Sequence, residues 1–522
     1  MTTTSPVAQR WFDQGLRYVY AFNHQEAVRS FRHAATLDRR MAMAHWGIAL
    51  ALGPNYNAAE MSASQRIEAQ TALRRAQALA GNAPAAERGY IEALALRLRD
   101  PFDADPLQSY IEYRDAMRAL MRAFPDDPDA ATLCAEAGML LRPWRLWNAD
   151  GTPAEGTDEV VMTLETVIAR HPRHTGAHHF LIHAVEASPQ PERALTSAQS
   201  LPALAPAAGH LVHMAAHIFD RVGDHPASAR ANASAIAADR AYIGREGRGS
   251  PYLGYYAHNL HFLAVAHMQQ GRYRDATRAA RAFGRYVAST MPDVPGVEGF
   301  LPAPAMIHTR FQRWDAVLAL RQPPATFAGP RAIWHFARGM AFVARGDLAQ
   351  AKSERNALDA AARSVSSGEA WGRNRAEAVV ALAASLLDGN LAWAAGERDA
   401  AIRIFDAGAV AEDALAYDEP APWLLPLREA LGAALLAAGD PGAAEGVFRA
   451  DLLRHPNSGR ALHGLAVSLE AQRKAHDDVD RQLARAWRNA DSPPRLGLVP
   501  ARGPSRAGRA TGHASADMTH LL

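Results

Sequence analysis

Alanine-rich helical periodicity runs through almost the whole chain of 522 residues, interrupted by short Gly-Asp, Pro and Asn signals. Strand-like alternation of polar and apolar residues is almost absent. The helical pattern also recurs with a period of about 34 residues. A short helical unit of this kind cannot bury its apolar face alone, so neighbouring units must stack on one another. The sequence therefore predicts an all-α fold built as an extended array of helix pairs.

Two copies of the repeat are nearly complete. The first has large and small residues at helix-packing positions: Trp11, Gly15, Tyr18, Ala27, Phe31 and Ala34. The late copy has the same pattern in Leu431, Gly432, Ala444, Phe448 and a closing Pro456. Weaker copies are phased on Ala194, Gly223, Gly271, Gly346 and Ala401. These residues resemble the tetratricopeptide repeat (TPR) family over roughly residues 8–490. The resemblance implies a right-handed superhelical solenoid whose first helices line a concave groove with repeat positions 2, 5, 9 and 12.

Composition excludes several classes of protein. The net charge of +2, without a basic block, gives no electrostatic footprint for nucleic acid. No apolar stretch approaches the roughly 18 residues of a membrane helix, and the N-terminus lacks the pattern of a signal peptide, so we expect a cytoplasmic protein without a membrane partner. Cys134 is the single cysteine, so any metal site must use His, Asp and Glu. The sequence leaves the oligomeric state open.

The chain divides into one long repeat region and a tail. Residues 1–490 are predicted to form the solenoid, with the functional site in the repeats at about 176–270. Residues 491–522 are rich in Pro, Gly, Ser, Arg and Ala without helical period, which predicts a disordered tail. Two interruptions, residues 143–160 and 240–256, are longer than normal turns. They are candidate lids over a site or simple insertions.

Histidines are concentrated in one part of the repeat region. Twelve of the 22 histidines lie between His171 and His267, in less than a fifth of the chain. The repeat phase sends side chains of three consecutive first helices into the groove. These are His179, His183 and Glu186 of the first helix, His210, His213, His217 and Asp220 of the second, and His258 and His261 of the third. Such agreement among three repeats is typical of a site.

The spacing of these histidines suits a transition metal. Residues three or four apart lie on the same face of a helix, so a pair of imidazoles can reach one ion. The predicted metal ligands are His179, His183, His213, His217, His258 and His261. Glu186 is the predicted further ligand or catalytic base. His210, Asp220 and Asn259 rank below them. Imidazole with carboxylate suits Zn, Fe, Mn or Cu, and the sequence does not choose among these ions.

A narrower resemblance rests on two runs of residues. These are Val212, His213, Ala216, His217 and Ile218, followed by His258, Asn259 and His261. The runs resemble a bacterial branch of TPR proteins related to tetratricopeptide repeat protein 38. This resemblance supports the histidine group as a unit but implies no particular activity.

The leading hypothesis is a soluble metalloenzyme that holds one or two transition-metal ions in the concave groove and acts on a small molecule or peptide. Two alternatives for the histidines are a groove that hydrogen-bonds an organic ligand and structural polar packing. The alternative function is a non-catalytic scaffold that binds an extended peptide or partner protein, which is common for this fold. Residues 55–57, Asn-Tyr-Asn, either bind a polar ligand at the mouth of the groove or close a turn. Phosphate-binding loops and nucleophile elbows are absent from the sequence.

Overall fold

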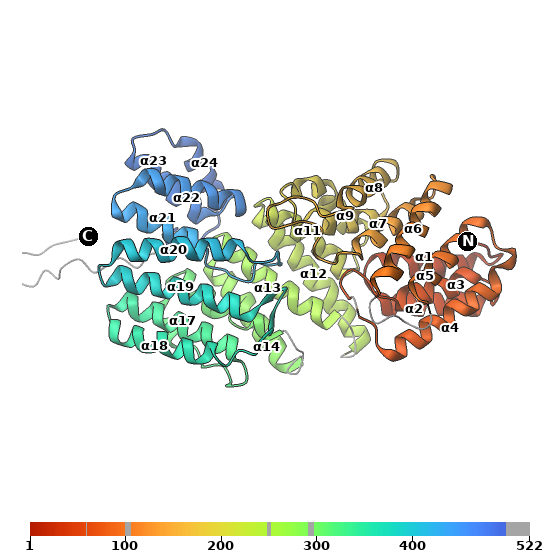
Figure 1. Ribbon diagram of the computed structural model, residues 1–522, viewed down its shortest axis with the longest axis horizontal. Helices are drawn as coiled ribbons and strands as arrows, with labels where there is room; N and C mark the ends of the chain where they lie inside the picture. The colour runs from red at the N-terminus through yellow and green to blue at the C-terminus, as the bar shows by residue number, and fades with distance from the viewer. Residues whose placement is uncertain (59, 100–105, 248–251, 291–296, 497–522) are drawn as a thin grey trace, which may run out of the picture.

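The computed structural model describes residues 1–58, 60–99, 106–247, 252–290 and 297–496 (Figure 1). These residues form α-helices that follow one another along the chain, with one two-stranded hairpin among them. The predicted all-α, TPR-type superhelical solenoid is therefore confirmed. In Figure 1, α1–α9 form one end of the molecule, α11–α13 the middle and α17–α23 the other end.

The helices of the N-terminal part are α1 (Pro6–Tyr20), α2 (His24–Leu37), α3 (Ala42–Leu52), α4 (Ala63–Leu79), α5 (Ala85–Arg97), α6 (Leu107–Ala123), α7 (Pro128–Met139), α8 (Thr157–Arg170) and α9 (Thr175–Val185). The central helices are α10 (Leu195–Leu204), α11 (Gly209–Arg221), α12 (His225–Glu246), α13 (Tyr252–Gln269) and α14 (Tyr273–Thr290). The C-terminal helices are α15 (Ala303–Arg310), α16 (Trp314–Leu318), α17 (Ala328–Arg345), α18 (Leu348–Ala362), α19 (Ala376–Ala394), α20 (Arg398–Asp413), α21 (Leu427–Ala438), α22 (Pro441–Arg454), α23 (Gly459–Ala471) and α24 (Asp477–Ala486). Short 3₁₀ helices are η1 (Ala80–Asn82), η2 (Pro191–Ala194) and η4 (Val297–Phe300), and the hairpin strands are β1 (Ala370–Trp371) and β2 (Asn374–Arg375).

Close packing of a glycine on an aromatic ring explains the two clearest repeats. Gly15 of α1 lies under the ring of Phe31 of α2, where a Cβ atom would come within 2.7 Å of the ring. Gly432 of α21 meets Phe448 of α22 in the same way, at 2.5 Å. A larger residue at either position would push the two helices apart. The Gly and Phe of the sequence repeat are thus the two sides of one helix–helix contact.

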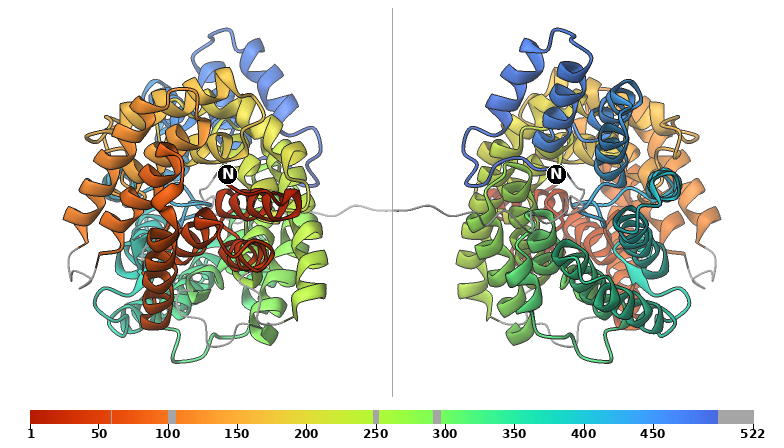
Figure 2. Two further views of the ribbon diagram at one scale, coloured as in Figure 1. Left: turned by 90° about the vertical axis from the view of Figure 1, so that its right-hand side faces the viewer. Right: turned by 90° about the vertical axis from the view of Figure 1, so that its left-hand side faces the viewer.

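The N-terminal helices curl far enough for α1 to reach α9. Gly176 of α9 lies against the ring of Tyr20, which leaves 2.5 Å to the position of a Cβ atom. The Tyr20 hydroxyl donates a hydrogen bond of 2.5 Å to Asp129. In the two end views of Figure 2 the helices encircle the long axis of the molecule. The turn between α1 and α2 is thereby brought beside the histidine-bearing helix α9.

The helix α19 is long and apolar enough, by length and composition, to cross a membrane. In the described structure, 56% of its most apolar window is buried inside the protein. It packs between α17, α18 and α20. A helix that is apolar on most sides is typical of the interior of a helical array, and packing accounts for this composition.

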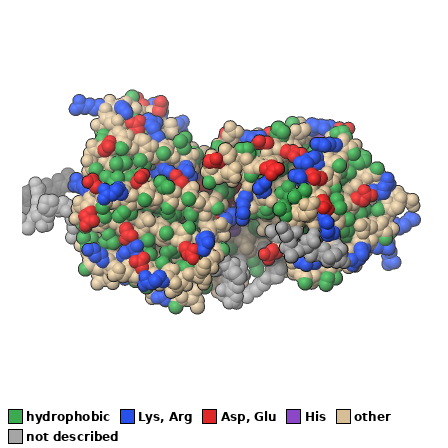
Figure 3. Space-filling view, viewed as in Figure 1, with side chains coloured by type: hydrophobic (Ala, Val, Ile, Leu, Met, Phe, Trp, Pro, Cys, Tyr) green, Lys and Arg blue, Asp and Glu red, His purple; other side chains and the backbone are tan. Residues whose placement is uncertain are grey.

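On the face shown in Figure 3, positive and negative side chains are interspersed.

The boundary of the predicted tail differs from the structure. Residues 491–496 contact the start of α14, the turn that follows α15 and the start of α23. The Asp491 carboxylate accepts hydrogen bonds from the backbone N–H groups of Tyr273 and Arg274 at 2.8 and 3.0 Å. The backbone oxygens of Arg495 and Leu496 accept from Arg460 and Gln312 at 3.1 Å each. Polar composition predicted disorder here, but helix capping fixes the segment. The rest of the predicted tail, 497–522, lies outside the described residues.

Two truncations separate these parts of the tail. Ending the chain before Asp491 is expected to lower the free energy of unfolding by about 2 kcal/mol or more, because α14 loses its N-terminal cap and further hydrogen bonds are lost. Ending it before Gly497 keeps these contacts and should leave stability unchanged. Urea unfolding of both truncated proteins beside the full chain measures the difference. Equal stability of all three proteins would show that residues 491–496 contribute nothing.

Candidate metal centre

Two groups of imidazoles lie side by side inside the solenoid. The first histidine group is His179 and His183 of α9 with His210 of α11, and the second is His213 and His217 of α11 with His258 of α13. Within each group, one ring nitrogen per residue lies within 4.8 Å of the others. All are buried except His258, which is half-buried. Glu186, His217 and Glu419 form a third such group, so His217 links the imidazoles to two carboxylates.

The helix order explains how these residues meet. The helix α11 contacts α9 on one side and α13 on the other. The spacing of four residues puts His179 above His183 on α9 and His213 above His217 on α11. The structure therefore brings together five of the six histidines predicted as ligands, together with the lower-ranked His210.

Hydrogen bonds orient the first histidine group. Nδ1 of His179 lies 2.6 Å from the backbone oxygen of Tyr20, and Nδ1 of His183 lies 2.9 Å from Oε1 of Glu186. Both partners are acceptors, so each Nδ1 carries the hydrogen and each Nε2 presents a lone pair. Neither Nε2 has a hydrogen-bond partner among the described residues. The two ring nitrogens of His210 are likewise buried without one there. This pattern is the one that metal-binding histidines adopt.

The second histidine group contains a close contact between two ring nitrogens. Nδ1 of His213 donates to Oδ1 of Asn232 at 2.8 Å, while the Asn232 amide donates to the backbone of Ser228. Nδ1 of His217 donates to Oε2 of Glu186 at 2.8 Å. The two Nε2 atoms then face each other at 2.8 Å. Two lone pairs at this distance repel, so one of the two Nε2 atoms must carry a hydrogen and donate it to the other.

Charge determines which imidazole holds a proton in the metal-free protein. Burial opposes the charged form of His217, but the adjacent carboxylates of Glu419 and Glu186 outweigh it and raise its pKa to about 10. Burial and the neighbouring imidazoles hold the pKa of His179, His183, His210 and His213 well below the usual value. Without metal, His217 is therefore the imidazolium and donates to a neutral His213. A metal ion held by both imidazoles would require this proton to leave.

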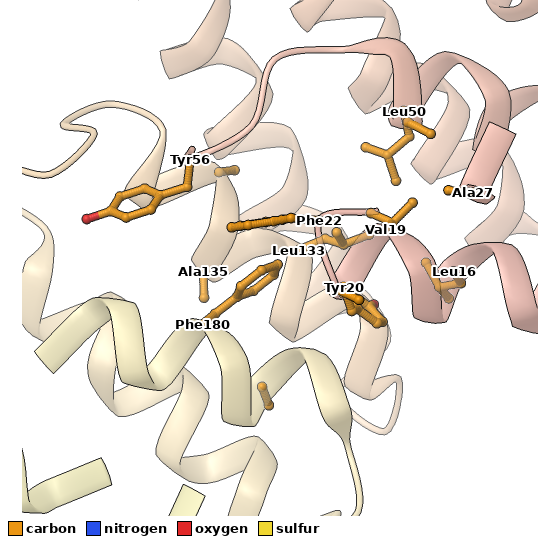
Figure 4. Close-up of a cluster of buried hydrophobic side chains, with 14 of the residues drawn as sticks. Leu16, Val19, Tyr20, Phe22, Ala27, Leu50, Tyr56, Leu133, Ala135 and Phe180 are labelled. Carbon is orange, nitrogen blue, oxygen red and sulfur yellow. The ribbon is translucent and has the colours of Figure 1, made fainter. Parts of the chain in front are cut away.

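Aromatic side chains from two strained turns enclose His183. Phe22 stacks on His183 at 5.8 Å between ring centroids, and the edge of Trp144 meets it at 5.3 Å. Both aromatic residues have positive φ angles, 52° and 61°, which side chains of this size rarely adopt. Figure 4 shows Phe22 in a cluster of buried apolar side chains with Tyr56, Phe180 and Leu133. Strain of about 1–3 kcal/mol per residue is typical of functional sites.

A cavity of about 610 Å³ adjoins the histidines. Its polar wall is formed by side chains of both histidine groups and by carboxylates: His183, His210, His213, His217, His258, Asp418 and Glu419. Its aromatic wall is formed by Trp144, Tyr255, Phe283 and Phe300. This volume lies in the range of small-molecule sites. A second cavity of about 440 Å³ also reaches His217 and Glu419 from the other side.

Of the two glutamates beside His217, Glu419 lines the first cavity and Glu186 does not. Both oxygens of Glu186 are occupied by the imidazoles of His183 and His217. Glu419 contacts His217 and also lines the cavity. Burial and the charge of Glu186 raise the pKa of Glu419 to about 7. A carboxyl group poised near neutrality is suited to proton transfer.

Three residues predicted for the site lie elsewhere. His261 packs against Phe283 and Phe300, 5.6 and 5.0 Å between ring centroids, and belongs to neither histidine group. The face of α13 toward α11 passes through His258 and Phe262, whose ring lies 5.4 Å from that of His213. His261 is turned away from that face. Asn259 donates to Asp239 at 2.7 Å, and Asp220 pairs with His225 at 3.1 Å in the second cavity.

The site also extends beyond residues 176–270. Asn57 and Trp144 reach it from the N-terminal part. Ala370, Gly372 and Arg373, together with Asp418 and Glu419, reach it from the C-terminal part. Asn55 closes its own turn by accepting from the backbone of Asn57 and Ala58. Sequence periodicity carries no signal for Phe22, Arg373 or Glu419, because the site residues that they contact, His183, Trp144 and His217, lie more than 150 residues away along the chain.

Comparison with known proteins identifies no family for this chain. No protein-family model matches the sequence, and no curated protein matches it. Among solved structures, the human IFIT1 dimer with m7Gppp-AAAA is 12% identical, with 94% of this chain and 92% of that chain covered and a TM-score of 0.32. Yeast Tom70 is 10% identical, with 93% of each chain covered and a TM-score of 0.30. The APC/C hetero-tetramer Cut9-Hcn1 is 13% identical, with 92% and 95% covered and a TM-score of 0.26. Likenesses this low carry no inference about ligands.

The chain folds as an all-α helical-repeat solenoid, and two adjoining groups of imidazoles lie inside it.

Proposed function

We propose that the protein binds one or two transition-metal ions, Zn, Fe, Mn or Cu, and uses them in an enzymatic reaction on a small molecule. The observation that carries this proposal is the first histidine group: three buried imidazoles with ring nitrogens within 4.8 Å and no other described partner for those nitrogens. Buried polar atoms without a partner cost about 1–3 kcal/mol each, so an arrangement of three needs a ligand to offset it.

The donor set fits such an ion. In the proposal, His179, His183 and His210 hold one ion, and His213, His217 and His258 hold the second. Glu186 orients two of these ligands through its two oxygens. The bound ion would supply Lewis acidity or oxygen activation to a substrate in the cavity. Glu419, beside His217 and exposed to the cavity, is the candidate base, a role that the sequence suggested for Glu186.

Two further features support the proposal. The runs Val212–Ile218 and His258–His261 resemble the bacterial branch of TPR proteins related to tetratricopeptide repeat protein 38, and they include three of the six proposed ligands. The single cysteine, Cys134, is buried, and burial raises the pKa of its thiol to about 11, so it does not compete for the metal. We place the protein in the cytoplasm.

Metal content tests the proposal directly. Protein purified without a histidine tag, or reloaded after chelation with Zn, Fe, Mn or Cu, is expected to hold one or two ions per chain by elemental analysis. Less than about 0.2 ions per chain, with no uptake of any of the four metals, would remove the proposed function. That result would favour the alternative, a scaffold that binds an extended peptide or a partner protein in the groove. Pull-down of a peptide by the metal-free protein would then be the next measurement.

A further inference from the structure

A hairpin from the C-terminal part of the solenoid reaches into the cavity beside the histidines. The strands β1 and β2 are joined by Gly372 and Arg373, and both residues line the cavity. The backbone N–H of Arg373 donates to Asp418 at 2.8 Å. Asn374 exchanges two hydrogen bonds with the backbone of Ala416, at 3.0 and 2.8 Å. The hairpin is thereby held to the segment that carries Glu419.

The close approach of this hairpin depends on glycine. A Cβ atom at position 372 would lie 1.8 Å from the Asp418 carboxylate, and the φ angle there is +61°. Only glycine accepts both conditions without displacement of the chain. The position of Arg373 is therefore built into the fold, and it is fixed relative to Glu419.

The Arg373 side chain is a cation without an ion pair. Its guanidinium has no carboxylate within 4.0 Å among the described residues. Its neighbour on the same hairpin, Arg375, pairs with Glu377 at 3.0 Å. The Arg373 side chain is exposed to solvent and lines the cavity. An unpaired guanidinium at a cavity wall is suited to bind an anion.

The orientation of Arg373 favours a planar anion. The guanidinium carbon lies 3.2 Å from the centroid of the Trp144 ring, so one face of the guanidinium is covered by the indole. The N–H groups in its plane remain available as a fork, which matches the two oxygens of a carboxylate. The carboxylates of Asp418 and Glu419 line the same cavity. They favour a ligand with one negative charge over a phosphate dianion.

We propose that Arg373 anchors the carboxylate of a small substrate whose remaining part is apolar and lies against Tyr255, Phe283 and Phe300. This inference names the substrate class of the proposed metal site and therefore rests on the proposed function. The carboxylate pairs with Arg373, and the apolar part extends along the aromatic wall toward the histidines.

Calorimetric titration of benzoate, acetate and inorganic phosphate tests the anchor. Benzoate is expected to bind more tightly than acetate because of the aromatic wall, and phosphate is expected to bind most weakly. Arg373→Gln should weaken benzoate binding by about tenfold or more, because a charge-assisted pair is lost. Arg373→Lys keeps the positive charge but lacks the two parallel N–H donors of a guanidinium. Its affinity for benzoate should therefore lie between those of the original protein and Arg373→Gln. Arg375→Gln is the matched control on the same hairpin and should bind benzoate as the original protein does.

The titrations are run on metal-free and metal-loaded protein, so that the two proposals can fail separately. Benzoate binding that depends on Arg373 in a protein that takes up no metal would support the anchor and remove the proposed function. Any of three results would overturn the anchor. The protein takes up metal but shows no detectable benzoate binding, Arg373→Gln binds benzoate as tightly as the original protein, or phosphate binds more tightly than benzoate. Thermal melting of each variant establishes that it is folded. If Arg373→Gln does not fold, Arg373→Lys still tests the anchor.

Discussion

Replacing His217 with alanine is expected to weaken metal binding by more than about 100-fold, the largest effect of any single substitution in the site. His217 belongs to both the second histidine group and the group with Glu186 and Glu419. Its loss removes one ligand and the group that bridges the imidazoles to the carboxylates. Elemental analysis after dialysis, with the titrated metal affinity, measures the effect.

The change in stability has two parts. With metal in hundredfold excess over Kd, binding stabilises the original protein by about 2.7 kcal/mol, and the variant loses this contribution. In chelator, the comparison reports the metal-free fold alone, where the carboxylates of Glu186 and Glu419 lose their imidazolium partner. A variant that keeps its metal but melts early in chelator would show that His217 is a packing residue.

His261→Ala is the matched control for His217→Ala. The spacing in the sequence predicts His261 as a ligand, whereas the structure places it against Phe283 and Phe300. We expect full metal content and a cost of about 1–3 kcal/mol in the metal-free protein, because a buried ring is removed. Loss of metal in this variant would show that α13 is rotated relative to the structure described above.

The repeat phase explains why so much of the histidine arrangement could be predicted. Each TPR unit sends the same positions of its first helix inward, so His179, His183, His213 and His217 could be assigned to one surface from spacing alone. At α13 the repeat phase predicted both His258 and His261 as groove residues, and only His258 joins the histidine groups. There His258 faces α11, and a residue three positions further along the helix is rotated by about 60° from it. That rotation separates His261 from the group.

Residues supplied by the curl of the solenoid could not be predicted. Phe22 reaches His183 because α1 packs against α9, and Glu419 reaches His217 because the C-terminal part returns to the middle of the molecule. Local periodicity carries no information about such contacts between distant repeats. The same limit applies to Arg373, whose hairpin interrupts the repeat pattern, and to Asp491, which caps a helix more than 200 residues earlier.

Acidification is expected to unfold the protein over a narrow range below pH 6. Burial lowers the pKa of His24, His261 and His308, which lie outside the ligand groups, to about 4 each. Their pKa in the unfolded chain is about 6.5. Between these values the unfolded chain binds more protons than the folded protein, so stability rises with pH and is lost as pH falls from 6.5 toward 4.

Whether acidification unfolds the protein depends on how steeply the free energy of unfolding falls with pH. These three protons alone change the free energy of unfolding by about 4 kcal/mol per pH unit near pH 5, against a total stability of about 5–15 kcal/mol for a typical protein. The lowered pKa values of His267 and of the neutral imidazoles in the two histidine groups make the slope steeper in chelator. Urea unfolding followed by circular dichroism from pH 7.5 to pH 5, with chelator present, measures the slope. His308→Gln removes one of the three groups and should reduce the slope by about 1.4 kcal/mol per pH unit. A stability that stays constant between pH 7 and pH 5 would contradict the burial of these imidazoles in neutral form.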